Sequence, residues 1–125
     1  SEGSTFGGYP LASVVGTYAI KVLADKKLAD NARIRGSQLI SHYEDIMDDF
    51  PDKIKEVRGK GLLTAFEMHD EKHLDGHKVS VELLNNGIYA KETHHSTVRI
   101  APALTIEAWQ IDNIAEQIRA VIKSL

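Results

Sequence analysis

The sequence contains no cysteine, only three prolines and only one tryptophan. Without cysteine the chain can form neither a disulfide bond nor a thiolate nucleophile. Its apolar stretch at residues 11–20 is well short of the roughly 20 apolar residues that cross a bilayer. These absences exclude disulfide frameworks and thiol catalysis, and they leave a membrane-spanning helix unsupported.

An excess of positive charge is also lacking. The 15 basic and 18 acidic residues give a net charge of -3, and they are scattered rather than grouped. Nucleic acids and anionic membranes attract proteins that carry a basic face. We therefore expect neither as a partner, and the length of 125 residues indicates a single globular domain.

The first part of the chain has the periodicity of helices. Between Pro10 and Asp49, apolar residues recur at three- and four-residue steps. The second of two apolar stripes consists of Leu28, Ala32, Leu39, Tyr43, Ile46 and Phe50. Gly36 falls on the same face, where a partner helix could come close. The helix is predicted to end at Phe50, because Pro51 disfavours a helical conformation in the residue before it.

After residue 51 the pattern alternates between strands and helices. We predict strands at 54–58 and 62–68 around a Gly59-Lys60-Gly61 turn, a helix at 74–86 closed by Gly87, strands at 88–91 and 97–100, and a helix at 106–125 with Thr105 as its N-cap. The predicted fold class is α+β. It consists of a small antiparallel or mixed sheet with helices on one face, preceded by a helical arm.

The chain opens on a loop rich in glycine and hydroxyl groups, SEGSTFGGYP. Ser4 and Thr5 offer two hydroxyls, and the glycines beside them leave backbone N–H groups accessible just before a predicted helix. Such a loop can hold a phosphate, although it has neither the Lys-Ser/Thr ending of a P-loop nor the preceding strand of a dinucleotide-binding motif. A flexible turn without a ligand is the alternative interpretation.

One arginine interrupts a short apolar strand, in the stretch TVRIAPAL. Arg99 must reach solvent or meet a partner, because an unpaired buried guanidinium is costly. Its planar fork suits a carboxylate in bidentate geometry. We therefore interpret Arg99 either as a carboxylate-binding residue or as one half of an ion pair with Glu92 or Glu67.

The histidines are the residues that could suggest a metal. His73 and His77 are four residues apart at a predicted helix start and could share one face. No third ligand with a recognisable spacing accompanies them, so a solvated helix face is the simpler interpretation. His94 and His95 are interpreted as loop residues, and the sequence predicts no metal site.

Four motifs resemble the C-terminal part of the class III aminotransferases. They are GSTFGG-P at residues 3–10, VRGKGLL at 57–63, NGIYAKETH at 86–94 and VRIAPAL at 98–104, in the order and at the spacings of the family. Within the family, the AKETH and VRIAP segments are most similar to those of ornithine aminotransferases. The resemblance implies a pyridoxal-phosphate enzyme of fold-type I, with this chain supplying the C-terminal small domain.

The resemblance also implies roles for single residues. Ser4 and Thr5 would hold the phosphate of a pyridoxal phosphate bound in the other subunit of a homodimer, with Thr5 the stronger candidate. Arg99 would bind the α-carboxylate of glutamate or 2-oxoglutarate, which agrees with the chemistry of its guanidinium. Residues 58–61 would form a structural turn. Glu2 and Tyr9 depart from the His and Asn usual at these positions, so the detailed phosphate contacts stay open.

For the chain as a whole, the resemblance implies three regions. Residues 1–10 would be a cofactor-phosphate loop of a large domain, residues 11–50 connecting helices, and residues 51–125 the small α+β domain. The lysine that binds the cofactor in this family belongs upstream of the GST loop. We therefore expect no catalytic residue among these 125 residues, and no activity from them alone.

The implied activity of the complete protein is transamination. A homodimer would transfer the δ-amino group of ornithine to 2-oxoglutarate, giving glutamate 5-semialdehyde and glutamate. Its compartment would be the cytoplasm, or the mitochondrial matrix if the source is an animal.

Three alternatives remain open. The first is another class III ω-aminotransferase, acting on acetylornithine or 4-aminobutyrate. The second is a non-catalytic module that binds an amino acid through Arg99, which predicts a carboxylate-dependent rise in thermal stability without pyridoxal phosphate. The third is a pure dimerisation element, which no small molecule should stabilise.

Overall fold

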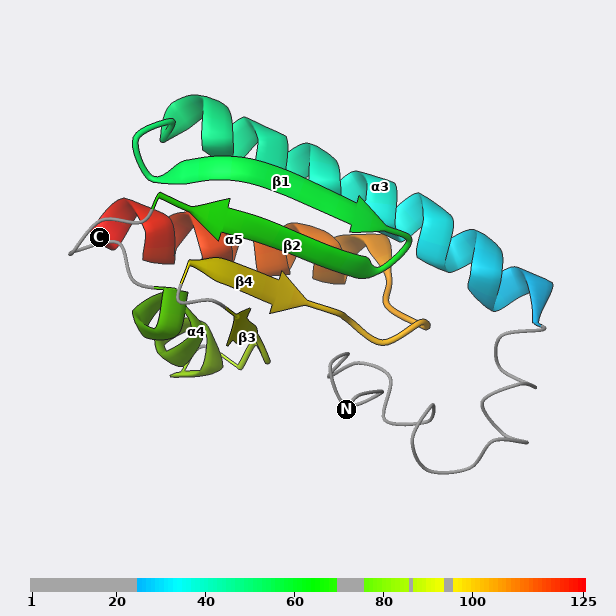
Figure 1. Cartoon of the computed structure of the whole chain (residues 1–125). Coiled ribbons are helices and arrows are strands. Elements are labelled where there is room, and N and C mark those ends of the chain that lie inside the picture. The colour runs from blue at the N-terminus through cyan, green and yellow to red at the C-terminus, as the bar shows by residue number, and fades with distance from the viewer. Residues whose placement is uncertain (1–24, 70–75, 86, 94–95) are drawn as a thin grey trace.

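The computed structural model describes residues 25–69, 76–85, 87–93 and 96–125 (Figure 1). In chain order the elements are α3 (Lys26–Asp49), β1 (Ile54–Lys60), β2 (Leu63–Met68), α4 (Gly76–Asn85), β3 (Lys91–Thr93), β4 (Thr97–Ile100) and α5 (Ala108–Ser124). The opening loop and the helix predicted from Pro10 onward lie outside the described residues.

The four strands form one antiparallel sheet in the order β1-β2-β4-β3. The three helices pack as a layer on this sheet: α5 contacts both α3 and α4, α3 contacts β1 and β2, and α4 contacts β3 and β4. In Figure 1, α3 and α5 run behind the sheet. We call the side of the sheet away from these described helices the open face. The predicted α+β fold with helices on one face is confirmed.

Alternation along the strands decides which side chains enter the core. Successive residues of a strand point to opposite faces, and Thr64, Phe66 and Met68 of β2 are buried on the helix side. The other main core residues are Leu39, Tyr43 and Ile46 of α3, Val79 and Leu83 of α4, Val98 and Ile100 of β4, and Ile111, Ile118 and Ile122 of α5. Helix α3 therefore shares one core with the elements that follow residue 51.

The β1–β2 hairpin turns later than predicted. β1 continues through Gly59, which pairs with Thr64 inside the ladder. The turn instead begins at Gly61, whose φ of 58° lies in the left-handed region that glycine adopts without strain. Gly36 of α3 packs against the Gly61 backbone. The close approach predicted at Gly36 is thus made by this turn, and the expectation of a partner helix there was wrong.

Glycine also closes α4, as predicted. Gly87 has a φ of 83°, and its N–H donates to the carbonyl of Leu84 while the N–H of Ile88 donates to the carbonyl of Leu83. This is the hydrogen-bond pattern of a Schellman cap. Because Ile88 is used in the cap and its side chain is buried, the strand predicted at 88–91 does not start there, and β3 begins at Lys91.

Helix α5 begins later than its apolar pattern suggested. The prediction of Thr105 as N-cap was wrong, because the cap is Glu107. The backbone N–H of Glu107 donates to Gln110 Oε1 at 2.9 Å. A side chain of the first turn thus accepts the hydrogen bond of the N–H group that precedes the helix.

The C-terminal end of α5 is held by a lysine of the segment that follows α3. Lys53 Nζ donates to the carbonyl oxygens of Ile122 at 3.1 Å and Leu125 at 3.0 Å. It also lies 5.2 Å from the centre of the Phe50 ring. Carbonyls at a helix C-terminus lack partners within the helix and carry partial negative charge, so Lys53 ties α5 to the segment between α3 and β1.

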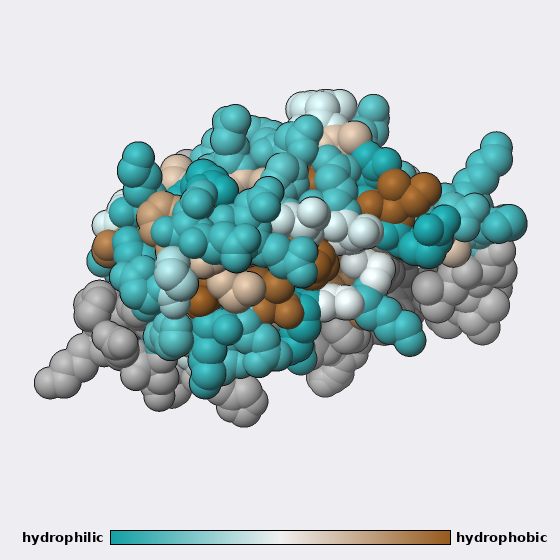
Figure 2. All heavy atoms as spheres, turned by 90° about the horizontal axis from the view of Figure 1, so that it is seen from above, coloured by the Kyte–Doolittle hydropathy of each residue, from teal (hydrophilic) through white to brown (hydrophobic). Residues whose placement is uncertain are grey.

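The surface seen from above the view of Figure 1 is mainly hydrophilic. Figure 2, which looks down on the molecule from above, shows hydrophobic residues in small separate groups among hydrophilic ones. Among the described residues, the large apolar side chains that remain exposed are Ile34, Val81, Leu84, Tyr89 and Trp109. Scattered apolar residues of this kind are normal on a folded surface.

Candidate functional site

Arg99 lies on the open face of the sheet. Its neighbours in β4, Val98 and Ile100, are buried on the helix side, so alternation along the strand points Arg99 to the opposite side. The side chain is half-buried and interacts within the chain. The guanidinium of Arg99 is therefore not forced into the core by the apolar residues beside it. The free-energy cost of burying an unpaired charge, which made this residue unusual in the sequence, does not arise.

Strand register places two further cations in line with Arg99. Arg99 is paired with Ala65 of β2 on one side and with Lys91 of β3 on the other, and Ala65 is paired with Arg58 of β1. Paired residues of neighbouring strands lie on the same face. In the row Arg58–Ala65–Arg99–Lys91, two arginines flank the small methyl group of an alanine and a lysine lies beyond Arg99. This arrangement is suited to an anion.

The acidic residues proposed as ion-pair partners of Arg99 have other basic neighbours. Glu67 lies 3.4 Å from Arg58 Nη1 and 3.7 Å from Lys55 Nζ. Glu92 lies 3.8 Å from His77 Nδ1, a pair that is ionic only when the histidine is protonated. Exposed pairs of this kind contribute little to stability. Glu67 partly neutralises the open face, whereas Glu92 is paired with Val98 and so lies on the helix side of the sheet.

Behind β4, two buried hydroxyls form a hydrogen-bonded chain. Thr64 Oγ1 donates to the carbonyl oxygen of Ile100 at 2.6 Å, and Tyr43 Oη lies 2.7 Å from Thr64 Oγ1. Both side chains are almost completely buried. Burial raises the pKa of Tyr43 well above its ordinary value of 10.0, so its hydroxyl stays protonated and available as a donor.

The loop after β4 is held by an asparagine of α3. Asn31 Nδ2 donates to the carbonyl oxygens of Leu104 at 2.8 Å and Ile106 at 2.9 Å. These residues are more than 70 positions away from Asn31 in the chain. Helix α3 therefore fixes the path of the backbone just after residues 101–103, the short segment that follows Arg99 and Ile100.

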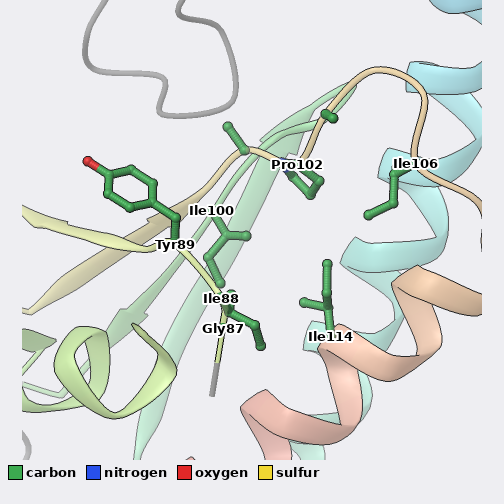
Figure 3. Close-up of a pocket in the computed structure, with 9 residues that line it drawn as sticks. Gly87, Ile88, Tyr89, Ile100, Pro102, Ile106 and Ile114 are labelled. Carbon is green, nitrogen blue, oxygen red and sulfur yellow. The ribbon is translucent and has the colours of Figure 1, made fainter. Parts of the chain in front are cut away.

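A hollow of about 280 Å³ lies beside this loop. Figure 3 shows Ile88, Ile100, Ile106 and Ile114 converging on it, while the Tyr89 ring points away. Its lining is apolar and contains no charged residue among those described. It cannot hold a carboxylate or phosphate by charge, so the anion-binding candidate is the open face at Arg99 and not this hollow.

A second, smaller hollow of about 200 Å³ lies between α3 and α5. His42 Nε2 lies 2.8 Å from Asp112 Oδ1, which also accepts from Gln38 Nε2 at 2.9 Å. The His42 and Gln38 hydrogen bonds hold the pKa of Asp112 below its ordinary value of 3.8. Farther along, Arg119 pairs with Asp49. These contacts join two helices and bring no reactive group near Arg99.

The remaining predicted site residues are distributed as follows. Ser4 and Thr5 lie outside the described residues, as do His73, His94 and His95. His77 is an exposed residue of α4. Among the residues that the structure describes, no three histidine, aspartate or glutamate side chains form a group that could hold a metal ion.

Sequence reasoning missed Tyr43, Thr64 and Asn31 as supports of the site. Thr64 did carry a signal, because a hydroxyl within the apolar run LLTAF needs a partner when it is buried. Asn31 carried none, since its partners are backbone carbonyls from the other end of the chain.

None of the described helices is both long and apolar enough to cross a membrane.

Comparison with known proteins places this geometry in a family. Residues 1–122 match the family Aminotransferase class-III. The mitochondrial ornithine aminotransferase of Arabidopsis thaliana is 35% identical over 124 residues, covering 98% of this chain and 26% of that protein. The ornithine aminotransferase of Staphylococcus carnosus (strain TM300) is 38% identical over 122 residues, covering 97% and 29%. The chain thus spans between a quarter and a third of the length of these relatives.

Solved structures share the fold. The ornithine δ-aminotransferase of Plasmodium falciparum superposes with a TM-score of 0.77 at 32% identity, covering 92% of this chain and 29% of that one. The acetylornithine aminotransferase of Elizabethkingia anophelis gives a TM-score of 0.78 at 33% identity, covering 93% and 29%. With a family match over nearly the whole sequence and the same fold in solved members, the chain belongs to the class III aminotransferases.

Proposed function

We propose that the complete protein transfers the δ-amino group of ornithine to 2-oxoglutarate, and that this chain supplies the residue that binds the α-carboxylate of the acceptor. The observation that carries the proposal is the position of Arg99 on the open face, in register with Ala65 and Lys91. The similarity to ornithine aminotransferases along nearly the whole chain supports the choice of donor.

In this proposal Arg99 orients the acceptor. Its guanidinium donates two parallel hydrogen bonds to the α-carboxylate of 2-oxoglutarate, and later to that of the product glutamate. A planar fork fixes both the position and the rotation of a carboxylate, which a lysine ammonium does not. Lys91 raises the local positive potential on the same face and favours the approach of a dicarboxylate.

The opening loop is proposed to hold the cofactor phosphate. The hydroxyls of Ser4 and Thr5 and the N–H groups of the adjacent glycines are the donor set that phosphate oxygens require. Pyridoxal phosphate, when bound, supplies the electron sink for amino-group transfer. As the resemblance implies, we propose that the two hydroxyls serve the cofactor of the partner subunit in a homodimer, with the catalytic lysine outside residues 1–125.

A second donor has an observation in its favour. The acetylornithine aminotransferase structure resembles this chain as closely as the ornithine aminotransferase structures do. Arg99 is proposed to bind the acceptor and does not distinguish the two donors, so both amines belong in the assay. On compartment, we propose the cytoplasm, or the mitochondrial matrix for an animal source.

The proposal is tested by replacing Arg99 in the complete enzyme. Arg99→Ala should raise the KM for 2-oxoglutarate by about tenfold or more, since one hydrogen bond to a charged group contributes about 1.5–3 kcal/mol. Initial rates are measured with ornithine and with acetylornithine as donor, across a range of 2-oxoglutarate concentrations.

Arg58→Ala is the matched control, because Arg58 lies in the same row but pairs with Glu56 and Glu67. It should change the KM for 2-oxoglutarate by about threefold at most, as expected for an exposed pair. An unchanged KM in Arg99→Ala, or equal effects of the two replacements, would contradict the role given to Arg99.

A further inference from the structure

The direction of the buried hydrogen-bond chain behind β4 can be assigned. A backbone carbonyl only accepts, so Thr64 donates its proton to Ile100 and keeps its oxygen lone pairs free. The hydroxyl of Tyr43 is then the donor to Thr64. Three elements, α3, β2 and β4, are linked in this order by one chain of two hydrogen bonds.

This chain ends one residue away from Arg99. Ile100 is the last residue of β4, and Thr64 faces it from the paired position of β2. Thr64 and Tyr43 lie on the helix side of the sheet, whereas Arg99 lies on the open face. Neither hydroxyl can therefore touch a ligand of Arg99, and any influence on that ligand must pass through the backbone of β4.

The backbone here has little freedom to compensate. Loss of the Thr64 hydroxyl would leave the Ile100 carbonyl short of one hydrogen bond and the Tyr43 hydroxyl without its acceptor, both inside the core. Buried polar groups without partners are unfavourable, which pushes the end of β4 to move. Asn31 holds Leu104 and Ile106 on the far side of the loop, so the movement falls on residues 99–103.

We propose that Thr64 and Tyr43 are positioning residues that set the orientation of Arg99 through the carbonyl of Ile100. The inference rests on the proposed role of Arg99 in binding the acceptor carboxylate. A bidentate contact tolerates little misplacement of the fork. The network therefore determines the affinity for the acceptor, and it leaves the amine donor, which other residues bind, unaffected.

The test uses the complete enzyme with Thr64→Val, which keeps the shape of the side chain and removes the hydroxyl. The KM for 2-oxoglutarate should rise by about five- to tenfold, the range expected for one lost hydrogen bond. The Kd of glutarate, an unreactive dicarboxylate, should rise equally when measured by displacement titration. The single-turnover kcat/KM for ornithine should change by less than about twofold.

Two further variants separate positioning from general destabilisation. Thr64→Ser retains the hydroxyl and should restore both values to within about twofold of the original enzyme. Tyr43→Phe leaves the hydrogen bond from Thr64 to Ile100 in place. It should raise the KM for 2-oxoglutarate and the Kd of glutarate by only about two- to threefold. If Thr64→Val does not fold, the Tyr43→Phe and Thr64→Ser values decide the question.

Ser80→Ala is the matched control. Ser80 is buried in α4, and its hydroxyl has no hydrogen-bond partner among the described residues, so its removal should leave glutarate affinity unchanged. The inference is overturned if Thr64→Val binds glutarate normally, if Ser80→Ala weakens binding as much, or if Thr64→Ser does not restore it. If Arg99→Ala weakens acceptor binding while Thr64→Val does not, this inference alone fails. If Arg99→Ala has no effect either, the proposed function fails with it.

Discussion

At the scale of single residues, Gly36 shows how one contact fixes an amino acid. A Cβ atom added at this position would overlap the carbonyl oxygen and carbon of Gly61. Both obstructing atoms belong to the backbone of the hairpin turn, where Gly61 itself adopts a positive φ. A flexible side chain could move aside, but this turn cannot move without breaking the register of β1 and β2. The packing of α3 on the hairpin therefore requires glycine at residue 36.

We accordingly predict that Gly36→Ala destabilises the chain. Alanine favours a helix over glycine by about 1 kcal/mol, but forcing an atom into a packed interface costs about 1–3 kcal/mol and sometimes more. Because both obstructing atoms are backbone, the cost should lie at the upper end of this range, and the net loss should be about 2 kcal/mol. It is measured as the free energy of unfolding in urea. Ser37→Ala, at the exposed neighbouring position, should change stability by no more than about 0.5 kcal/mol. A Gly36→Ala protein as stable as the original would show that the turn is free to move.

At the scale of elements, the contact between α3 and α5 is a polar seam beside the core. Asp112 of α5 accepts from His42 and Gln38 of α3 through the same carboxylate oxygen. Arg35, which donates to Gln38 Oε1 at 2.8 Å, also lowers the pKa of Asp112 through its charge, after the hydrogen bonds of His42 and Gln38. The ionised carboxylate is thus the form that holds the two helices together.

The sign of the resulting pH dependence follows from this preference. Because the pKa of Asp112 is lower in the folded chain than its ordinary value of 3.8, its contribution is present above that value and is lost as the pH falls through the folded-state pKa. Asp112→Asn should lower the thermal midpoint at about pH 7, and the difference from the original chain should shrink below about pH 4. Thermal unfolding followed by circular dichroism across this range measures it.

A double-mutant cycle identifies the partner. In a His42→Ala background, Asp112→Asn should have a smaller effect at neutral pH than in the original chain, because its first hydrogen bond is already gone. Equal effects in the two backgrounds would show that the His42 contact does not contribute.

At the scale of the whole molecule, the two faces of the sheet have different tasks. The helices cover one face and bury the apolar side chains. The open face carries the row of Arg58, Arg99 and Lys91. The fold therefore presents cations from a rigid sheet. This suits the carboxylate-binding role proposed for Arg99, because a sheet positions a side chain more firmly than a loop does.

We predict that residues 1–125 alone do not transaminate. The prediction follows from the family resemblance, which puts the cofactor-binding lysine upstream of residues 1–125. Among the described lysines, Lys53 caps α5 and Lys91 belongs to the cationic row. Supplied with pyridoxal phosphate, ornithine and 2-oxoglutarate, the chain should form no glutamate above the blank in a coupled assay. The complete enzyme is the positive control, and turnover by the chain alone would contradict the prediction.

Local signals in the sequence determined much of the fold. The three- and four-residue periodicity predicted α3 and α5, because the side chains of a helix must meet the core at that spacing. Gly87 predicted the end of α4, because a left-handed residue is needed there. The oddity of Arg99 within an apolar strand was also visible, since its cause is the chemistry of one side chain. The phosphate-binding role of Ser4 and Thr5 stays a prediction.

Only the tertiary structure decided which residues meet. It set the strand order β1-β2-β4-β3 and the face on which Arg99 lies. It also formed the hydroxyl chain to Ile100, whose two hydrogen bonds join residues 21 and 36 positions apart in the sequence. The ends of elements were misjudged for the same reason: Glu107 replaced Thr105 as cap, and Ile88 entered the core instead of a strand. Periodicity reports how a segment divides between core and solvent, whereas pairing and capping are settled by partners that the segment does not contain.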